Sequence, residues 1–569
     1  MRFILFLGFL LFFNQALLAQ ALSVETISAH IQHDLQTKLS GKNKTIVQNL
    51  YARTGNKPLW IGAANKEKMS QLIQALNEPL YNYKNKAFNQ KTIRTLTYML
   101  DNNQFSASKK AAVYSRLDIA LSSAFVYLVR FVVQGDVDWN LVQQKLKALK
   151  QSDDIRADWE MSPKPFPDEE ALAQAVANGT VRSYLDSLLP MEKRYRRLVK
   201  MLRNYRIMDK FPQIKYSNKP LKLGDRSFRV KEIKRRLQIS GDYPANAPID
   251  WKFDRTLERA VKTYQKRYLL KINGQVDKRV TYYLNQPVKK NIQAIITNLD
   301  KTKLYPKRFE KEYVAVNIPD FNLRYYRNYV MLMKTGIVVG RIDRPTPIFS
   351  DKIEYMVLNP TWTIPDNLIK RDLIHVLREN PAYLVENNIH VFSGRKEINV
   401  TQAMLDPYEH SSKHVPYRFV QYPGDNNALG RVKFMFPNKY SVYLHDTDNK
   451  SLLTRRYKIY SSGCMRVDKP FALMDLLLEH AKGHYSQEDI DAIIATNKPK
   501  TIRLKQPIPV HILYFTVFEE DGLAYFKNDI YLYDKIIEES SEGHMKATFT
   551  MPKKRMGRIK KKEDVPLSN

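Results

Sequence analysis

Near Lys311 the spacing of apolar residues changes, and this change limits the kind of fold that the chain can adopt. Before it, apolar residues recur three and four positions apart, as at Ile27, Ile31 and Leu35, which predicts amphipathic helices. After it, short β-prone runs such as residues 313–318 alternate with turn residues, which predicts strands. A helical region followed by a strand-rich region predicts a multidomain α+β protein.

The length and the cysteine content limit how such a protein is stabilised. A chain of 569 residues exceeds what a single hydrophobic core usually supports, so we expect about three domains. Cys464 is the only cysteine, which excludes intramolecular disulfides. Stability therefore has to come from packing.

The N-terminus has the layout of an export signal. Met1-Arg2 is a charged start, residues 3–13 are apolar, and Ala19-Gln-Ala21 supplies a cleavage pattern before Leu22. An uncleaved membrane anchor is the alternative, although the apolar segment is short for a span. We predict an exported protein of the periplasm or cell envelope. A lone thiol in an exported chain is a candidate reactive group.

The apolar runs and the net charge indicate which classes of partner the protein favours. The other long apolar run, residues 117–133, carries Asp118 and Arg130, which predicts a buried helix and no integral membrane protein after signal cleavage. The formal net charge of +34 favours a polyanion or an anionic surface. The sequence shows no nucleic-acid module, so anionic envelope components are better candidates than nucleic acid. A basic surface without a dedicated partner is the alternative.

Residues 440–466 hold the chemistry that distinguishes this chain. Cys464 lies in Ser461-Ser-Gly-Cys-Met-Arg466, nineteen positions after His445. A nearby imidazole makes the thiolate, the nucleophilic form of cysteine, accessible at neutral pH. The Ser-Ser-Gly run predicts a tight turn that can aim backbone N–H groups at an oxyanion. The alternative is that Cys464 is a small buried apolar residue, as most free cysteines are.

This constellation resembles the signature of the YkuD-type L,D-transpeptidase catalytic domain, in which a histidine is followed by Ser/Thr-X-Gly-Cys. The run Leu-His-Asp-Thr at 444–447 and the run Ser-Ser-Gly-Cys-Met-Arg-Val at 461–467 are similar to the large, multidomain branch of that family. Residues 316–320 and 429–438 are similar to it as well, and the resemblance extends over roughly residues 24–530.

The resemblance implies a division of the chain. A helical scaffold and a three-helix peptidoglycan-binding module would precede a β-rich catalytic domain with a capping insertion. Residues 221–286 have the helical spacing and the Asn273-Gly274 turn of that module, although a helical domain that binds no glycan would show the same pattern. We expect a signal peptide at 1–21, the scaffold at 22–215, the module at 216–290, a linking helix at 291–310, the catalytic domain at 311–535 with the capping insertion at 366–428, and a basic, disordered tail at 536–569.

For the chemistry, the resemblance implies that Cys464 attacks the third residue of a peptidoglycan stem tetrapeptide, with loss of D-alanine. An acceptor amine then resolves the acyl-thioester and gives a 3→3 cross-link. His445 is the expected base, and the backbone N–H groups of Gly463 and Cys464 are the expected oxyanion hole. The resemblance implies no cofactor and no metal.

Three further side chains are expected in the site. Tyr443 should share the strand face of His445, because residues two apart point to the same side, unless it is a core aromatic. Ser462 and Arg466 should order the turn and bind substrate, and Arg466 suits a carboxylate, unless it only bonds the loop. Asp446 should point to the opposite face, so a backbone carbonyl is expected to orient the imidazole.

Three other histidines are expected outside the chemistry. His480 and His484 lie four apart without a visible third ligand, so we expect solvated residues at a helix end. His511 alternates within an apolar strand and is expected in the core.

The sequence leaves the acceptor open. Water in place of the amine would make the chain a peptidoglycan L,D-carboxypeptidase or endopeptidase, and a protein amine would attach that protein to peptidoglycan. A wall-binding protein with a vestigial site is the non-enzymatic alternative. Peptidoglycan stem peptides and glycan are the expected partners.

Overall fold

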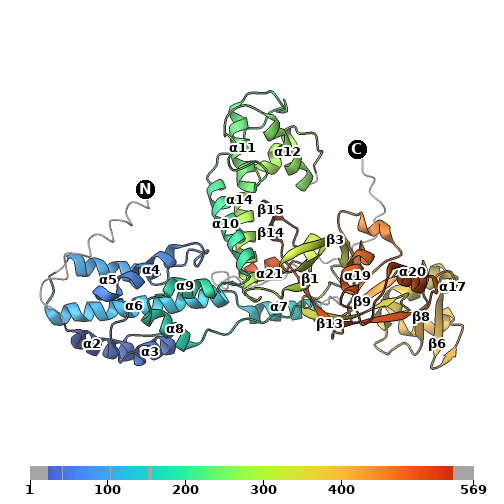
Figure 1. Ribbon diagram of the computed structural model, residues 1–569, viewed down its shortest axis with the longest axis horizontal. Helices are drawn as coiled ribbons and strands as arrows, with labels where there is room; N and C mark the ends of the chain where they lie inside the picture. Colours follow the sequence, from blue (N-terminus) through green and yellow to red (C-terminus); the bar gives the residue numbers. More distant parts are fainter. Residues whose placement is uncertain (1–22, 42, 103, 152–156, 269, 542–569) are drawn as a thin grey trace.

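The computed structural model describes residues 23–41, 43–102, 104–151, 157–268 and 270–541 (Figure 1). The expected signal peptide and the cationic run that begins at Pro552 lie outside the described residues. Within them, a helical N-terminal region is followed by a three-helix module and a β-rich C-terminal domain. The fold is multidomain α+β, as the sequence predicts.

The N-terminal region is a helical scaffold built around α6 (Ala107–Gln134). By length and composition α6 could cross a membrane, but 83% of its apolar window is buried within the protein. This burial agrees with the predicted core helix. The helices around it are α2 (Val24–Thr37), α3 (Lys44–Ala52), α4 (Lys66–Asn77), α5 (Gln90–Asn102), α8 (Glu169–Ala177), α9 (Val181–Ser187) and α10 (Glu192–Met208).

A buried carboxylate on α6 holds the loop that follows α3. Asp118 accepts the backbone N–H groups of Leu59, Trp60 and Ile61 at 2.9, 2.9 and 3.1 Å. The Tyr51 hydroxyl donates to the same carboxylate at 2.6 Å. Burial raises the pKa of Asp118, whereas these hydrogen bonds favour its ionised form. One side chain thus satisfies three backbone donors that the loop cannot pair within itself.

Two helices connect the scaffold to the three-helix module. α10 and α14 (Val288–Thr302) pack side by side, and the module lies at their far end (Figure 1). The module has its own apolar core, formed by α11 (Phe228–Ser240), α12 (Arg255–Arg267) and α13 (Lys278–Leu284).

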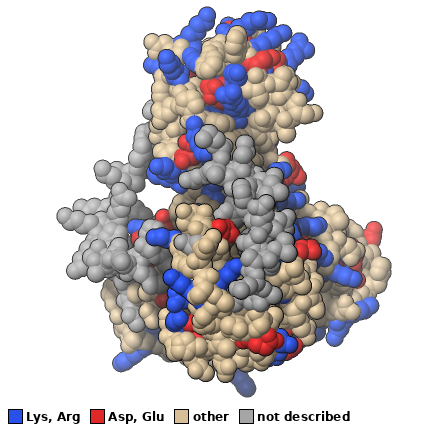
Figure 2. All heavy atoms as spheres, turned by 90° about the vertical axis from the view of Figure 1, so that its left-hand side faces the viewer, with Lys and Arg blue, Asp and Glu red and all other residues tan. Residues whose placement is uncertain are grey.

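The module displays part of the high positive charge. Lys and Arg side chains stand out over the upper lobe in Figure 2, which is the module. The exposed cations of α12 are Arg255, Arg259, Lys262 and Lys266.

The C-terminal domain is a nine-stranded sheet. Its strand order is β11-β3-β12-β10-β9-β4-β13-β1-β2, and an additional β2–β3 pairing closes the sheet on itself. The strands are β1 (Glu312–Asn317), β2 (Asn322–Arg327), β3 (Val330–Gly340), β4 (Ser350–Leu358), β9 (Val432–Met435), β10 (Leu444–His445), β11 (Ile459–Ser461), β12 (Met465–Val467) and β13 (Lys500–Leu513). α19 (Pro470–Leu478) and α20 (Gln487–Ala495) contribute to the apolar core of this sheet.

Residues 362–421 interrupt the sheet with a small subdomain that has its own apolar core. It contains a four-stranded sheet of order β5-β8-β6-β7. Its elements are β5 (Trp362–Thr363), α15 (Asp366–Leu368), a π-helical turn (Ile369–Leu373), α16 (Ile374–Glu379), α17 (Tyr383–Glu386), β6 (Ile389–Ser393), β7 (Lys396–Glu397), α18 (Gln402–Leu405) and β8 (Arg418–Gln421). We call this subdomain the cap.

The packing units differ from the expected sequence boundaries. α7 (Trp139–Gln151), assigned by sequence to the scaffold, contributes Trp139, Val142 and Leu146 to the core of the nine-stranded sheet. Conversely, the hairpin of β14 (Val517–Glu520) and β15 (Leu523–Phe526) contributes Val517 and Ala524 to the scaffold core. Apolar surface pairs with whatever surface the tertiary fold brings against it, so sequence order does not define these cores.

The strand that carries His445 is only Leu444–His445, because Ser441 has φ +55° and the chain turns there. The predicted boundary of the tail is wrong. The tail expected from residue 536 overlaps α21 (Tyr533–Glu539), where Ile536 and Ile537 are buried in the core of the nine-stranded sheet.

Removal of the Asp118 carboxylate should destabilise the scaffold. In Asp118→Ala, three buried N–H groups lose their acceptor, and each orphaned donor costs about 1–3 kcal/mol, so we expect a loss of at least about 3 kcal/mol in urea unfolding. The control is Asp209→Ala, at an exposed position after α10, which should change stability by less than about 0.5 kcal/mol. Equal stability of the two variants would contradict this account.

Candidate active site

Strand pairing brings the sequence-predicted residues together. β10 lies between β9 and β12, and its His445 is in register with Lys433 on β9 and with Arg466 on β12. Cys464 immediately precedes β12, where the Met465 N–H donates to the Tyr443 carbonyl at 3.0 Å. The thiol therefore begins the strand that is paired in parallel with the strand of the histidine.

A tight turn presents the thiol. Gly463 has φ +115°, a conformation that side-chain-bearing residues rarely adopt. Ser461 Oγ accepts the Gly463 N–H at 3.2 Å and donates to the Cys464 carbonyl. The Gly463 N–H, predicted to face an oxyanion, is thus engaged within the turn. The Cys464 N–H forms no hydrogen bond with the residues that the structure describes.

Two residues from the loop after β3 hold this turn from outside. Thr346 Oγ1 donates to the Gly463 carbonyl at 2.8 Å. Arg344, only 6% exposed, donates to Ser462 Oγ at 3.0 Å. Its guanidinium also binds both carboxylate oxygens of Asp372, at 2.5 and 3.1 Å, and Asp372 lies in the π-helical turn of the cap. One arginine therefore connects the thiol turn to the cap.

The histidine is held in one orientation by the backbone. His445 is 4% exposed, and its Nδ1 is hydrogen-bonded to the Asp446 carbonyl at 2.5 Å, the type of partner that the sequence predicts. Burial, together with the nearby positive charges of Arg466 and Lys433, lowers the pKa of His445 to about 3, although the hydrogen bond to Asp446 acts to raise it. The imidazole is therefore neutral at pH 7 and available as a base.

The Asp446 carboxylate lies away from the imidazole and has a structural role. It accepts the Arg431 N–H at 2.9 Å and forms an ion pair with Lys450. A Cβ on Gly430 would lie 2.3 Å from this carboxylate, so glycine is required there. Asp446 is thus not a third member of a catalytic triad, as the alternation of strand side chains predicts.

Tyr443 lies between the histidine and the thiol. Its ring centroid is 5.7 Å from that of His445, and the ammonium of Lys433 is 5.7 Å from the Tyr443 ring. Burial raises the pKa of Tyr443, and the neighbouring Cys464 sulfur raises it further. The phenol therefore stays protonated beside the sulfur.

The sulfur is protonated in the resting site. Burial raises the pKa of Cys464 to about 11, although the backbone and phenol of Tyr443 and the charges of Arg466 and Lys433 act to lower it. Since His445 is neutral as well, the site holds a neutral thiol and a neutral imidazole rather than a thiolate and an imidazolium. Nucleophilic attack from this state needs the thiol to lose its proton as it reacts.

Arg466 is placed to bind an anion. Its Nη1 donates to Thr447 Oγ1 at 3.2 Å, whereas its buried Nε has no partner among the described residues. Burial lowers the pKa of Arg466, and the charges of Asp448 and Cys464 act in the opposite direction.

Sequence reasoning missed Ser461, Arg344 and Lys433. Lys433 lies on β9 between buried Val432 and Phe434. A cation between two buried apolar residues of a strand could have indicated a functional role from sequence. Arg344 and Ser461 have no such signal, because their partners come from distant parts of the chain or from the turn geometry.

The other histidines lie outside this site. His480 is not solvated as expected: it is half-buried, 3.1 Å from the Glu312 carboxylate. His511 is in the core, as predicted, with Ser350 Oγ at 2.8 Å and Glu310 at 2.9 Å. Among the described residues, no group of three or more metal-binding side chains is found.

Comparisons with known families agree with this geometry. Residues 311–502 match the family model described as "L,D-transpeptidase catalytic domain". The region of the chain that carries Cys464 and His445 is therefore similar to this family of catalytic domains. Residues 45–202 match a "Scaffold domain", and residues 227–284 match a "Putative peptidoglycan binding domain". The matched parts are the sheet with its cap, the helical scaffold and the three-helix module.

Individual relatives support the same family. A Haemophilus influenzae protein named "Putative L,D-transpeptidase" is 34% identical over 224 residues, which are 39% of this chain and 45% of the relative. The chain thus spans less than half the length of that relative. Solved L,D-transpeptidases of Xylanimonas cellulosilytica and Stackebrandtia nassauensis are 11% and 12% identical, cover 52% and 53% of this chain and 99% and 97% of their own, and have TM-scores of 0.18 and 0.19.

The protonation state predicts how thiol reactivity depends on pH. Because the raised pKa of Cys464 lies near 11, the thiolate fraction should rise about tenfold per pH unit from pH 7 to 10, and iodoacetamide alkylation should follow it. Tyr443→Phe removes the phenol that lowers the pKa of the thiol, and a loss of about 1 kcal/mol in thiolate stabilisation should slow alkylation about fivefold at fixed pH. Tyr440→Phe, whose hydroxyl bonds Glu160, is the matched control. A rate plateau below pH 7 would indicate a preformed ion pair instead.

The Arg344 contact should couple the thiol turn to the cap. Arg344→Lys keeps the charge but loses the bidentate contact, so amide hydrogen exchange should rise about tenfold in both residues 461–464 and residues 369–373. Arg267→Lys is the control, because Arg267 makes a similar bidentate pair with Asp242 in the three-helix module, away from both segments. Faster exchange in only one of the two segments would show that they are independent.

Proposed function

We propose that this protein is a peptidoglycan L,D-transpeptidase of the cell envelope with Cys464 as its nucleophile. The observation that carries the proposal is the placement of Cys464 at the start of β12, beside the Tyr443 phenol and one strand from the neutral base His445. Arg466 and Lys433 supply positive charge on either side of the histidine strand. The export signal and the three-helix module agree with an envelope location.

The first step is acylation. The Cys464 sulfur attacks the carbonyl of the third residue of a donor stem tetrapeptide, and its proton passes to His445. The bond to the terminal D-alanine then breaks, and its leaving amine takes that proton from the imidazolium. A neutral thiol and a neutral imidazole suit this order of steps, because the imidazole both accepts and returns one proton.

The second step forms the cross-link. A side-chain amine of an acceptor stem attacks the thioester carbonyl and loses a proton to His445. The carbon–sulfur bond then breaks as the 3→3 linkage forms, and the departing Cys464 sulfur takes that proton from the imidazolium. The Cys464 N–H is the donor for the developing oxyanion in both steps. The Gly463 N–H joins it only when its bond to Ser461 Oγ is given up, so we assign it the lesser role.

Arg466 and the cap position the donor. The free Nε of the buried Arg466 guanidinium suits a stem carboxylate. The cap, connected to Ser462 through Arg344 and Asp372, would close over the stem and order the turn at the same time. Exclusion of water by such closure favours the amine acceptor over hydrolysis.

The decisive experiment is intact-protein mass spectrometry with a tetrapeptide-bearing muropeptide. The native chain should gain a thioester adduct and then yield a 3→3 dimer, whereas Cys464→Ala should do neither. Release of tripeptide alone would identify a carboxypeptidase, and transfer to a protein amine would identify protein attachment. No adduct on the native chain would contradict nucleophilic catalysis by Cys464.

A further inference from the structure

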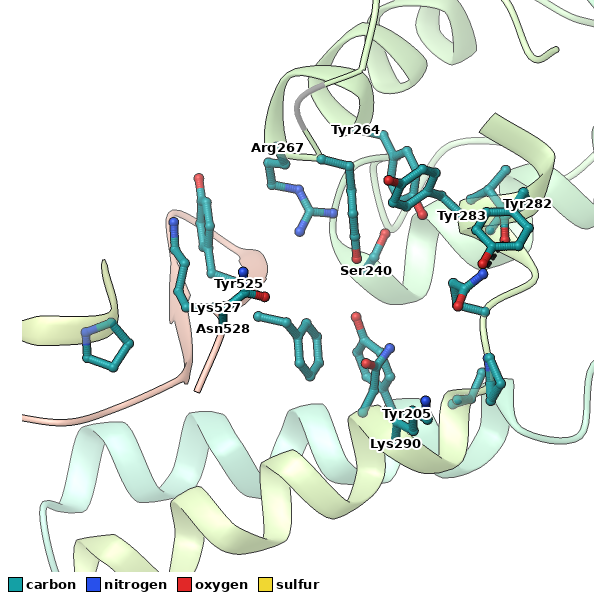
Figure 3. A pocket seen from close by; sticks show the side chains of 18 of the residues that line it. Tyr205, Ser240, Tyr264, Arg267, Tyr282, Tyr283, Lys290, Tyr525, Lys527 and Asn528 are labelled. Atoms are coloured by element: carbon teal, nitrogen blue, oxygen red, sulfur yellow. Dashed lines mark hydrogen bonds between the residues drawn. The ribbon is translucent and has the colours of Figure 1, made fainter. Parts of the chain in front are cut away.

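A cavity lies where three parts of the molecule meet, outside the thiol site. It has a volume of about 580 Å³ and is bounded by the three-helix module, by α10 and α14, and by the β14–β15 hairpin (Figure 3). The segment that leads into β11 completes its wall through Arg456 and Tyr457. No single domain forms this cavity.

The lining is aromatic and positively charged. Seven tyrosines and five Lys or Arg residues line it, and none of its described lining residues is Asp or Glu. Figure 3 shows Tyr264, Tyr282 and Tyr283 on the module side and Tyr525 on the hairpin, with the space between them. Ligand sites combine such aromatic surface with a few polar groups that fix orientation.

Four of the tyrosines form a connected set of rings that runs from Tyr264, which is 4% exposed in the module core, to the exposed Tyr282. The Tyr264 and Tyr268 centroids are 4.3 Å apart, and Tyr268 is 5.8 Å from Tyr283. Tyr282 continues the set at 5.7 Å from Tyr283, and it is 55% exposed. A sugar ring has an apolar C–H face and polar edges, so a row of rings with hydroxyl groups matches an oligosaccharide better than a purely apolar ligand.

Two of the five cations are available to a ligand. Arg267 is paired with Asp242, Lys527 with Asp320 at 2.9 Å, and Arg236 donates to the Pro212 and Leu284 carbonyls. Lys290 and Arg456 are exposed and form no ion pair within the described residues. Their uncompensated charges favour an anionic ligand, because charge-assisted contacts to carboxylates are the strong ones.

The cavity wall continues into the thiol turn. Tyr457 accepts a hydrogen bond from Asn528 at 3.1 Å, and the chain proceeds from Tyr457 through β11 to Cys464. A second connection starts at Tyr531, the residue that follows the lining residue Ile530 in the chain. The Tyr531 hydroxyl accepts the Thr346 N–H at 3.2 Å, and the Thr346 hydroxyl donates to the Gly463 carbonyl. A ligand in the cavity is thus held by the same framework that holds the nucleophile.

We propose that this cavity binds a glycan segment of the peptidoglycan strand, with sugar rings on the tyrosines and a carboxylate of the strand at Lys290 and Arg456. The site is separate from the one that takes the donor stem. The inference rests on the proposed function for the source of the ligand. In this proposal, the junction of the domains keeps the glycan strand bound while the thiol reacts.

The test measures binding by calorimetry to the full chain carrying Cys464→Ala, which prevents turnover. The probe is an uncross-linked strand of two disaccharide-tetrapeptide units. Adding Lys290→Glu and Arg456→Glu should weaken binding at least about tenfold, since each charge-assisted contact is worth about 1.5–3 kcal/mol. Lys289→Glu with Arg455→Glu makes the same charge change at neighbouring positions that do not line the cavity, and should leave the affinity unchanged.

A second pair of variants tests the ring surface. Tyr282→Ala should weaken binding of both the strand and a neutral N-acetylglucosamine tetramer, whereas Tyr98→Ala, an exposed tyrosine on α5, should affect neither. Equal affinity of the two charge-reversal variants would overturn the proposal. The proposal would also be overturned if Tyr282→Ala weakened binding of the free tetrapeptide as much as binding of the strand, because the site would then recognise peptide and not glycan.

The two proposals fail separately. Thioester formation on the native chain with unchanged strand affinity in Lys290→Glu/Arg456→Glu would overturn the glycan subsite and leave the transpeptidase intact. Loss of strand binding in that variant without any thioester on the native chain would support the glycan subsite and overturn the transpeptidase.

Discussion

The parallel pairing of β10 with β12 is the interaction on which the site depends. It sets His445 beside Arg466 and puts Cys464 at the beginning of a strand whose neighbour carries the base. Because strand side chains alternate between faces, a slip of one residue would turn the imidazole away from the thiol side and bring Asp446 in its place. The bonds from Ser461, Thr346 and Arg344 then act on a geometry that the sheet has already defined.

The chemical residues were predictable from sequence because they are close together along the chain. His445, Tyr443 and Cys464 lie within one short stretch, and the two-residue period of a strand is enough to separate the roles of His445 and Asp446. The helical and β-rich regions were predictable for the same reason, since apolar periodicity is a local property. The buried α6 was predictable because charged residues within an apolar run favour protein surroundings over lipid.

The supporting residues were not predictable, because their roles arise from distant contacts. Arg344 acts through Ser462 and Asp372, which are 118 and 28 residues away. The engagement of the Gly463 N–H depends on turn geometry that a Ser-Ser-Gly run does not specify. The cavity at the domain junction has no sequence signature at all, because its walls come from four separate stretches of the chain.

The exchange of core elements between regions has a consequence for how the molecule is built. α7 completes the core of the catalytic sheet, while the β14–β15 hairpin inserts Val517 and Ala524 into the scaffold. A fragment cut at the ends of the matched segments would leave apolar faces uncovered on both pieces. The scaffold and the β-rich domain therefore share packing across their boundary, and we expect them to unfold together, whereas the three-helix module has a separate core.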